Sequence, residues 1–472
     1  MATADHGRDS KNLPLSGGFP QKICDNGPVS DATGVEAAPS VLLSFRAENA
    51  RSFRDPLELS LLPTAMAESE VVREVPWREG GSPIGVLPVA GVLGANASGK
   101  SNLLRIMDDM RRLVLTSFRL GVPTGGIERH PFRLDGTSAL PTRFEVDLIV
   151  EGIRYEYGFS FDDDRVLTEW AFYFPKGRAK LLFERNGDDV DFGSEARRSS
   201  RAAFDLLRPN ALFLSTAASA NHPALLPLFE WFHRNLLLAE VDTRNPRQAF
   251  TAQMLDDPKR QEGVLALLRA ADLGITGAIR HEIDPKVKER VAKAMRVLAG
   301  ETDDAESDDD IELGTLVTLT HRSADGQVPF GPAEESLGTL VWFGLVGPVL
   351  DALEKGAVLL ADELDASLHP ALVRHLVRLF QDQSTNPRRA QLIFNSHDAT
   401  LLDADAQPLG RDQVWLAEKT NDGATSLYSL ADLKPRKHEA IEKRYLEGRY
   451  GGVPIVSWPE FAAAAELVTG TK

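Results

Sequence analysis

Residues 94–101 read GANASGKS, and this stretch decides the fold. It matches the G-x-x-x-x-G-K-[ST] pattern in full and follows an apolar run at 89–93 that suits a strand buried on both faces. Glycines let backbone N–H groups approach phosphate oxygens, and the helix expected after them points its positive dipole end at the same place. We therefore predict a phosphate-binding loop in which Lys100 supplies charge to the phosphates and the Ser101 hydroxyl binds Mg²⁺.

A pair of carboxylates follows a second apolar run, at 358–361. Beside a phosphate loop, Asp362 would hold Mg²⁺ through water and Glu363 would act as general base. A third run, at 392–394, leads to His397, and ligands bind at the carboxyl ends of parallel strands. Two plainer interpretations stay open: a solvated turn for the acidic pair and a helix cap for the histidine.

The spacing of the motifs predicts a large insertion. Lys100 and Asp362 are 262 residues apart, too far for a simple doubly wound nucleotide-binding core. Alternating runs at 143–150 and 154–161 predict a β-hairpin, and an earlier pair of runs at 41–45 and 57–61 predicts a β-hairpin or two neighbouring strands. From 200 to 299 the pattern is helical and includes Leu236, and a strand is expected at 313–320. The last third alternates strand and helix, as in a largely parallel α/β sheet.

Composition excludes several classes of protein. The chain has 472 residues, a net charge of −16 and one cysteine, Cys24, which excludes a disulfide framework and a cysteine-rich zinc module. The apolar stretch 340–350 is too short to span a bilayer, and the first residues lack a signal core, so we expect a cytoplasmic protein without a membrane span. The acidic balance argues against a surface coated by nucleic acid. One basic cluster, at 434–449 with Tyr445 and Tyr450 interleaved, fits either a solvated face or nucleic-acid stacking.

Four strings in this order, GANASGKSN, ESLGT, LLADELDASLHP and NSHD, resemble an ABC-type ATPase of the RecF/SMC-like group. More narrowly, the chain is similar to the stand-alone AAA-15/AbiL-like ATPases, some of which occur in bacterial anti-phage and abortive-infection systems. The resemblance covers residues 41 to about 456. It implies an α/β P-loop NTPase fold with an ABC/RecF-like nucleotide-binding domain, an N-terminal antiparallel β subdomain and an inserted helical region.

The resemblance also implies roles for individual residues. Asp362 would be the Mg²⁺ carboxylate, Glu363 the catalytic base and His397 the switch histidine that senses the γ-phosphate of ATP. Ser336 and Gly338 would form the signature motif, which in this group contacts ATP bound to the opposite protomer, so a homodimer or higher homo-oligomer with sandwiched ATP is expected. The phosphate-loop residues expected to bind ATP are Gly94, Asn96, Gly99, Lys100, Ser101 and Asn102.

The domain organisation expected from these motifs has five parts. Residues 1–39 form a disordered tail, 40–199 the first ATPase lobe, and 200–330 a helical insertion with an acidic loop at 301–312. Residues 331–456 form the second lobe with the signature, acidic pair and switch histidine, and 457–472 a C-terminal tail.

The chain departs from the ABC pattern in one respect, because no Gln lies between Lys100 and Gln248 to contact Mg²⁺ and water. The first functional hypothesis is an Mg²⁺-dependent ATPase that acts as a nucleotide-switched regulator of a partner effector, a nuclease or toxin, in anti-phage defence. The alternatives are an ATP-binding sensor or scaffold with little turnover, and a RecF-like DNA-repair ATPase that binds nucleic acid through the basic cluster.

Overall fold

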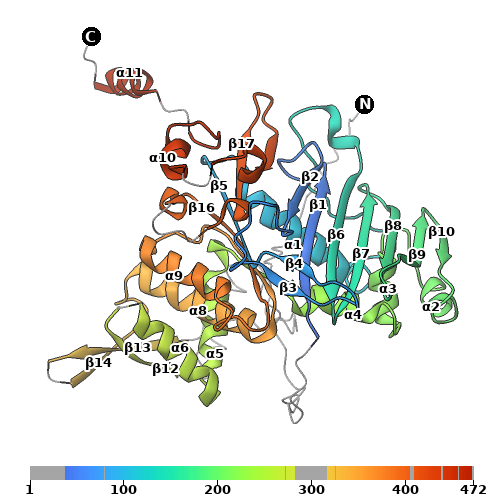
Figure 1. Cartoon of the computed structure of the whole chain (residues 1–472), viewed down its shortest axis with the longest axis horizontal. Helices are drawn as coiled ribbons and strands as arrows, with labels where there is room; N and C mark the ends of the chain where they lie inside the picture. The colour runs from blue at the N-terminus through green and yellow to red at the C-terminus, as the bar shows by residue number, and fades with distance from the viewer. Residues whose placement is uncertain are drawn as a thin grey trace, which may run out of the picture.

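The structure, a computed structural model, describes residues 38–78, 80–271, 273–281, 316–324, 326–403, 409–436, 439–454 and 457–469. Cys24, nearly all of the expected N-terminal tail and the acidic loop 301–312 lie outside these residues. Figure 1 shows two large sheets side by side, with the earlier part of the chain in one and the later part mainly in the other.

The first sheet is antiparallel and has seven strands, as expected for the N-terminal β subdomain. Its hairpin strands β6 (Thr142–Val150) and β7 (Ile153–Phe161) are the alternating runs predicted from the sequence, and β1 (Val41–Glu48) pairs with β2 (Leu57–Ser60) as predicted. In spatial order the strands are β10 (Asp189–Phe192), β9 (Lys180–Asn186), β8 (Val166–Tyr173), β7 (Ile153–Phe161), β6 (Thr142–Val150), β1 (Val41–Glu48) and β2 (Leu57–Ser60).

The second sheet has six strands and carries the nucleotide-binding motifs. All neighbours pair in parallel except the last two. The carboxyl ends of the parallel strands therefore meet at one edge, where ligands bind in open α/β sheets. In spatial order the strands are β11 (Leu236–Ala239), β15 (Val358–Ala361), β16 (Gln391–Ser396), β5 (Val89–Gly94), β17 (Val414–Lys419) and β18 (Thr425–Ser429).

Helices cover both faces of the parallel sheet. The helices on one face share a core with the antiparallel sheet, and they are α1 (Lys100–Thr116), α3 (Phe213–Ser219) and α4 (Leu226–Arg234). The helices on the other face form a second core, and they are α5 (Arg244–Met254), α6 (Pro258–Ala270), α8 (Leu337–Lys355) and α9 (Pro370–Gln381). Strand β15 shows the division, because Val358 and Leu360 face the first core whereas Leu359 and Ala361 face the second.

One buried side chain joins the two large sheets. The Gln391 side chain accepts a hydrogen bond from the Leu42 N–H (2.7 Å) and donates one to the Leu42 carbonyl (2.9 Å). Because the side-chain amide pairs with both the N–H and the carbonyl of the facing residue, neither main-chain group is left unpaired in the core. These two hydrogen bonds hold β1 against the first residue of β16, the strand that leads to His397.

The remaining elements are smaller. They are α2 (Arg197–Phe204), α10 (Ile441–Leu446), α11 (Trp458–Thr469), the two-stranded sheet of β3 (Arg73–Val75) and β4 (Ile84–Val86), and the three-stranded sheet of β12 (Ile275–His281), β13 (Leu316–Ser323) and β14 (Gly326–Phe330). The segment 458–469, expected as part of a tail, is helical, and its Trp458 is exposed.

The helical pattern predicted from 200 to 299 is wrong at two places. Helix α4 ends at Arg234, and Leu236 lies in β11, an edge strand of the parallel sheet. Four consecutive apolar residues form a buried strand as readily as a helix turn, and periodicity does not separate the two. Strand β12 also lies within this segment.

Helix α8 accounts for the longest apolar stretch. In the described part of the chain it is the one helix long and apolar enough to cross a membrane, and 61% of its most apolar window is buried inside the protein. Its Trp342, Phe343 and Val346 pack in the second core. Burial of this kind is typical of a core helix.

Candidate nucleotide-binding site

The loop at 94–99 connects β5 to α1, as predicted, and two of its glycines are sterically required. A Cβ on Gly94 would lie 2.4 Å from the Ala417 carbonyl oxygen. Gly99 has φ +105°, a conformation that L side chains rarely adopt, and a Cβ there would lie 2.2 Å from Thr425 Oγ1. Gly99 also caps α1 without a side chain, so the first-turn amides of this helix are left for another acceptor.

Residues outside the loop at 94–99 hold it in place through hydrogen bonds. The Thr425 hydroxyl donates to the Ser98 carbonyl oxygen (2.8 Å), and the Thr425 N–H donates to the Ser52 carbonyl oxygen (2.7 Å). Asn102 on α1 donates to Ser52 Oγ (2.9 Å), whereas the Asn96 side chain is exposed. Asn102 therefore supports the loop from α1, and Asn96 is free to face a ligand.

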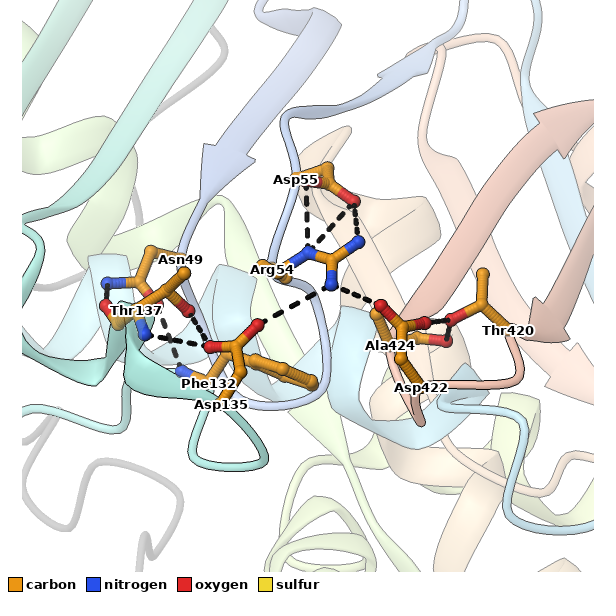
Figure 2. Close-up of polar contacts among 9 residues, drawn as sticks. All are labelled: Asn49, Arg54, Asp55, Phe132, Asp135, Thr137, Thr420, Asp422 and Ala424. Atoms are coloured by element: carbon orange, nitrogen blue, oxygen red, sulfur yellow. Dashed lines mark hydrogen bonds and ion pairs between the residues drawn. The ribbon is translucent and has the colours of Figure 1, made fainter.

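Figure 2 shows a cluster of acids around Arg54, two residues after Ser52. The guanidinium pairs with Asp55 (3.0 Å), Asp135 (3.4 Å) and Asp422, the last in the turn between β17 and β18. Hydrogen bonds with Asp55 and Asp422 raise the pKa of Arg54 above its usual range. The cluster joins the turn between β1 and β2 to the hairpin that carries Thr425.

Lys100 is 5% exposed and folds back over the loop. Its ammonium donates to the carbonyl oxygens of Gly94 (2.9 Å) and Ala95 (2.8 Å) and lies 3.5 Å from His397 Nδ1. Burial lowers the pKa of Lys100 to about 8, although three nearby carboxylates oppose this shift. An anion in the loop would stabilise the charged form of Lys100, which burial disfavours.

The two residues predicted to hold Mg²⁺ are joined by one side chain. The amide nitrogen of Asn395, near the end of β16, donates to Asp362 Oδ1 (2.5 Å) and to Ser101 Oγ (3.3 Å). Mg²⁺ prefers oxygen ligands, such as a hydroxyl, a carboxylate oxygen and phosphate oxygens. The described residues contain no cluster of three or more His, Cys, Asp or Glu suited to a metal. The Ser101 hydroxyl and the Asp362 carboxylate thus fit a metal that is bound partly by a nucleotide rather than by protein side chains alone.

Glu363 lies directly after Asp362 and is exposed, with φ +50°. Nearby, the carboxylate of Asp365 accepts a hydrogen bond from the His397 N–H (3.2 Å). Burial and then the charge of Lys100 lower the pKa of His397, so its ring is neutral at neutral pH. The structure therefore brings His397 next to Lys100 and to the turn that follows the acidic pair.

The two residues expected to form the signature motif lie at the start of α8. Ser336 caps this helix, and its hydroxyl accepts a hydrogen bond from the Thr339 N–H (3.1 Å). A Cβ on Gly338 would lie 2.8 Å from the Ser367 carbonyl oxygen, so the signature packs against the turn after the acidic pair. Within the described ranges no hydrogen bond joins Ser336 or Gly338 to the loop at 94–101.

Sequence reasoning missed Glu240 as well as Asn395. Glu240 follows β11, whose Ala239 pairs with Ala361, so the strand register places Glu240 beside Asp362. Arg105 on α1 donates to Glu240 (2.7 Å) and lies 3.9 Å from Asp362 Oδ2. The sequence signal is an acid after a four-residue apolar run, and the helical pattern predicted from 200 to 299 includes this run. Gln248, by contrast, donates to the Leu340 carbonyl (3.0 Å) in the packing of α5 on α8.

Two arginines of the C-terminal basic cluster pair with acids. Arg444 pairs with Glu439 (2.5 Å), and Arg449 pairs with Glu447 (3.0 Å). Lys437 and His438 of this cluster lie outside the described residues. These pairings favour the interpretation as a solvated face.

Comparisons with known proteins agree with the motifs. Residues 89–403 match the family model described as "AAA domain, putative AbiEii toxin, Type IV TA system". No curated protein matches the sequence. Similar solved structures include an SMC head domain from Thermotoga maritima (13% identity, 82% of this chain and 98% of that chain, TM-score 0.36) and the recombination mediator protein RecF with ATP (13%, 84% and 100%, TM-score 0.34).

The TM-scores of these structures are low, so the family match and the geometry carry the interpretation. The match spans more than half of the chain and includes the phosphate loop, both carboxylates and His397. The predicted α/β P-loop fold is confirmed by the family and by the mixed sheets around the loop. The chain belongs to the family described as "AAA domain, putative AbiEii toxin, Type IV TA system".

Proposed function

We propose that this protein binds and hydrolyses ATP with Mg²⁺ and acts in the cytoplasm as a nucleotide-switched regulator of a partner effector in bacterial defence. The observation that carries the proposal is the single amide that bridges Ser101 and Asp362, although the two residues are far apart in the chain. Lys100 lies on the same edge of the sheet, through its contact with His397. The proposed effector is a nuclease or toxin, and the AbiEii toxin named in the family description supports this context.

Each site residue has a distinct chemical task in this proposal. The amides at the start of α1 and the Lys100 ammonium bind the β- and γ-phosphates. Ser101 and Asp362 would hold Mg²⁺, which when bound neutralises charge that develops on the phosphates. Glu363 accepts a proton from the attacking water, and the neutral ring of His397 contacts the γ-phosphate. Catalysis is then mostly positioning and electrostatic stabilisation.

The proposed assembly is a homodimer with ATP between two subunits. The resemblance to ABC-type ATPases supports this arrangement, and so does the position of Ser336 and Gly338 at the start of a helix, where anions bind. Gly338 packs on Ser367 of the turn after Glu363, so a change at the acidic pair has a direct route to the signature.

The test is the Glu363→Gln variant, compared with Glu184→Gln, which changes an exposed glutamate in the antiparallel sheet. We expect Glu363→Gln to bind ATP with wild-type affinity, to hydrolyse it roughly 100-fold or more slowly, and to accumulate as a dimer in ATP. Glu184→Gln should match the wild type. Hydrolysis by Glu363→Gln at the wild-type rate would show that Glu363 is not the base.

A second candidate function is an ATP sensor with little turnover. The acid Glu240, rather than a glutamine, lies beside Asp362, and Gln248 is engaged with α8. Single-turnover and multiple-turnover measurements separate the two functions, because tight ATP binding without product formation favours the sensor.

A further inference from the structure

We propose that Asn395 is a positioning residue that holds Asp362 and Glu363 in the geometry that hydrolysis requires. The proposal rests on the ATPase function proposed above and deepens it. Asn395 is 1% exposed and lies near the end of β16, two residues before His397. It is the first residue of the NSHD string, in which the sequence predicts a role only for His397.

Both polar ends of the Asn395 side chain are used within the site. Its nitrogen donates to Asp362 Oδ1 (2.5 Å) and to Ser101 Oγ (3.3 Å), and its oxygen accepts the Glu363 N–H (2.5 Å). An asparagine amide has two donor hydrogens and one carbonyl oxygen, so this set occupies both donors and the acceptor. One side chain thereby fixes the distance between the metal-side residues and the position of the proposed base.

The backbone of Glu363 shows why such a clamp is needed. With φ +50° it lies in the left-handed region, which is uncommon for a residue with a side chain and persists only where the surroundings enforce it. Asn395 binds on both sides of this residue, because its own carbonyl oxygen accepts the Leu364 N–H (3.1 Å). Without these bonds the turn would relax, and the Glu363 carboxylate would move from the position that the proposed base requires.

A second buried asparagine provides the matched control. Asn386 is fully buried, like Asn395, but its side chain binds only main-chain groups: it donates to the carbonyls of Phe380 and Ala390 (both 2.8 Å) and accepts the Ala390 N–H (2.7 Å). Substitution of Asn386 therefore measures the effect of losing a structural amide. Any effect at Asn395 beyond a loss of stability reports on the site.

The experiment compares Asn395→Leu with Asn386→Leu, since leucine keeps the volume and removes every side-chain hydrogen bond while the main-chain bonds stay. ATP affinity with Mg²⁺ and with EDTA, steady-state hydrolysis and the thermal midpoint are measured for each. We expect Asn395→Leu to lower kcat roughly 10- to 100-fold and to weaken Mg²⁺-dependent ATP binding by a similar factor. ATP affinity in EDTA should stay within about twofold of wild type, because Lys100 and the loop are unchanged. Asn386→Leu should lower the thermal midpoint only.

Wild-type kcat in Asn395→Leu, or an equal loss of ATP affinity with and without Mg²⁺, would overturn the proposal. If the leucine variant does not fold, Asn395→Asp replaces it, because aspartate keeps the shape and the acceptor but does not donate to Asp362 when ionised. A reduced kcat in folded Asn395→Asp supports the proposal, and an unchanged kcat overturns it. If the wild type hydrolyses ATP, Glu363→Gln does not and Asn395→Leu does, this inference fails while the ATPase function stands. A wild type that binds no ATP removes both.

Discussion

ATP affinity should fall as pH rises, because Lys100 is partly deprotonated before nucleotide binds. Burial lowers its pKa to about 8 in the free protein, and a bound triphosphate favours the charged form, so binding takes up a proton. If only the ammonium form binds, the charged fraction drops from about three quarters at about pH 7.5 to about one tenth at about pH 9. The dissociation constant should therefore rise about eightfold, or about 1.2 kcal/mol of binding free energy. The γ-phosphate is fully ionised throughout this range.

The assay is isothermal titration with ATP at constant Mg²⁺ across this pH range. Near pH 8, titrations in two buffers of different ionisation enthalpy should show uptake of about half a proton per site. Lys419→Gln is the control, because this exposed lysine donates to the Ala97 carbonyl of the same loop (3.3 Å). It should keep the wild-type pH dependence. An affinity that stays constant between these pH values, or no proton uptake, would refute the assignment of Lys100 as the phosphate-binding charge.

Three further substitutions test the supports of the site. Thr425→Val removes the hydrogen bond to the Ser98 carbonyl without changing volume, and should lower the free energy of unfolding in urea by about 1–2 kcal/mol and weaken ATP binding; unchanged stability would contradict this. His397→Gln should weaken ATP binding slightly, because the proposed contact of the ring with the γ-phosphate is lost, and should slow turnover in single-turnover assays. Wild-type turnover should fall as pH drops into the range where the ring gains a proton. Arg54→Gln should lower the thermal midpoint slightly at low salt and not at about 1 M salt, since its acid cluster is exposed; a loss that is independent of salt would count against this.

Local signals were enough to predict the phosphate loop and most of the strands that carry the site. Alternation identified β6 and β7, and the apolar runs before Gly94 and Asp362 identified β5 and β15. These segments are defined by neighbours in the sequence, so period and turn chemistry describe them well. The order β15-β16-β5 could not be read from the sequence, because it depends on pairings between distant segments.

The residues that sequence reasoning missed act through contacts between distant segments. Asn395 opens the NSHD string, but nothing in that string predicts its role, which comes from its contacts with Ser101 and Asp362 across two strand ends. The helical pattern predicted from 200 to 299 includes the LLLA run before Glu240, although this run forms β11, so the pattern does not point to Glu240. Correct assignment of β11 as a parallel neighbour of β15 would have placed Glu240 beside Asp362.

The most direct test of the shared site is the equilibrium binding of ATP, measured with Mg²⁺ and with EDTA. The test compares the wild type with the Lys100→Ala and Asp362→Ala variants. We expect one ATP per wild-type chain. Lys100→Ala should bind at least roughly 30-fold more weakly in both conditions, and Asp362→Ala should lose affinity only when Mg²⁺ is present. Wild-type affinity in both variants would contradict the central claim that Lys100 and Asp362 act on the same triphosphate.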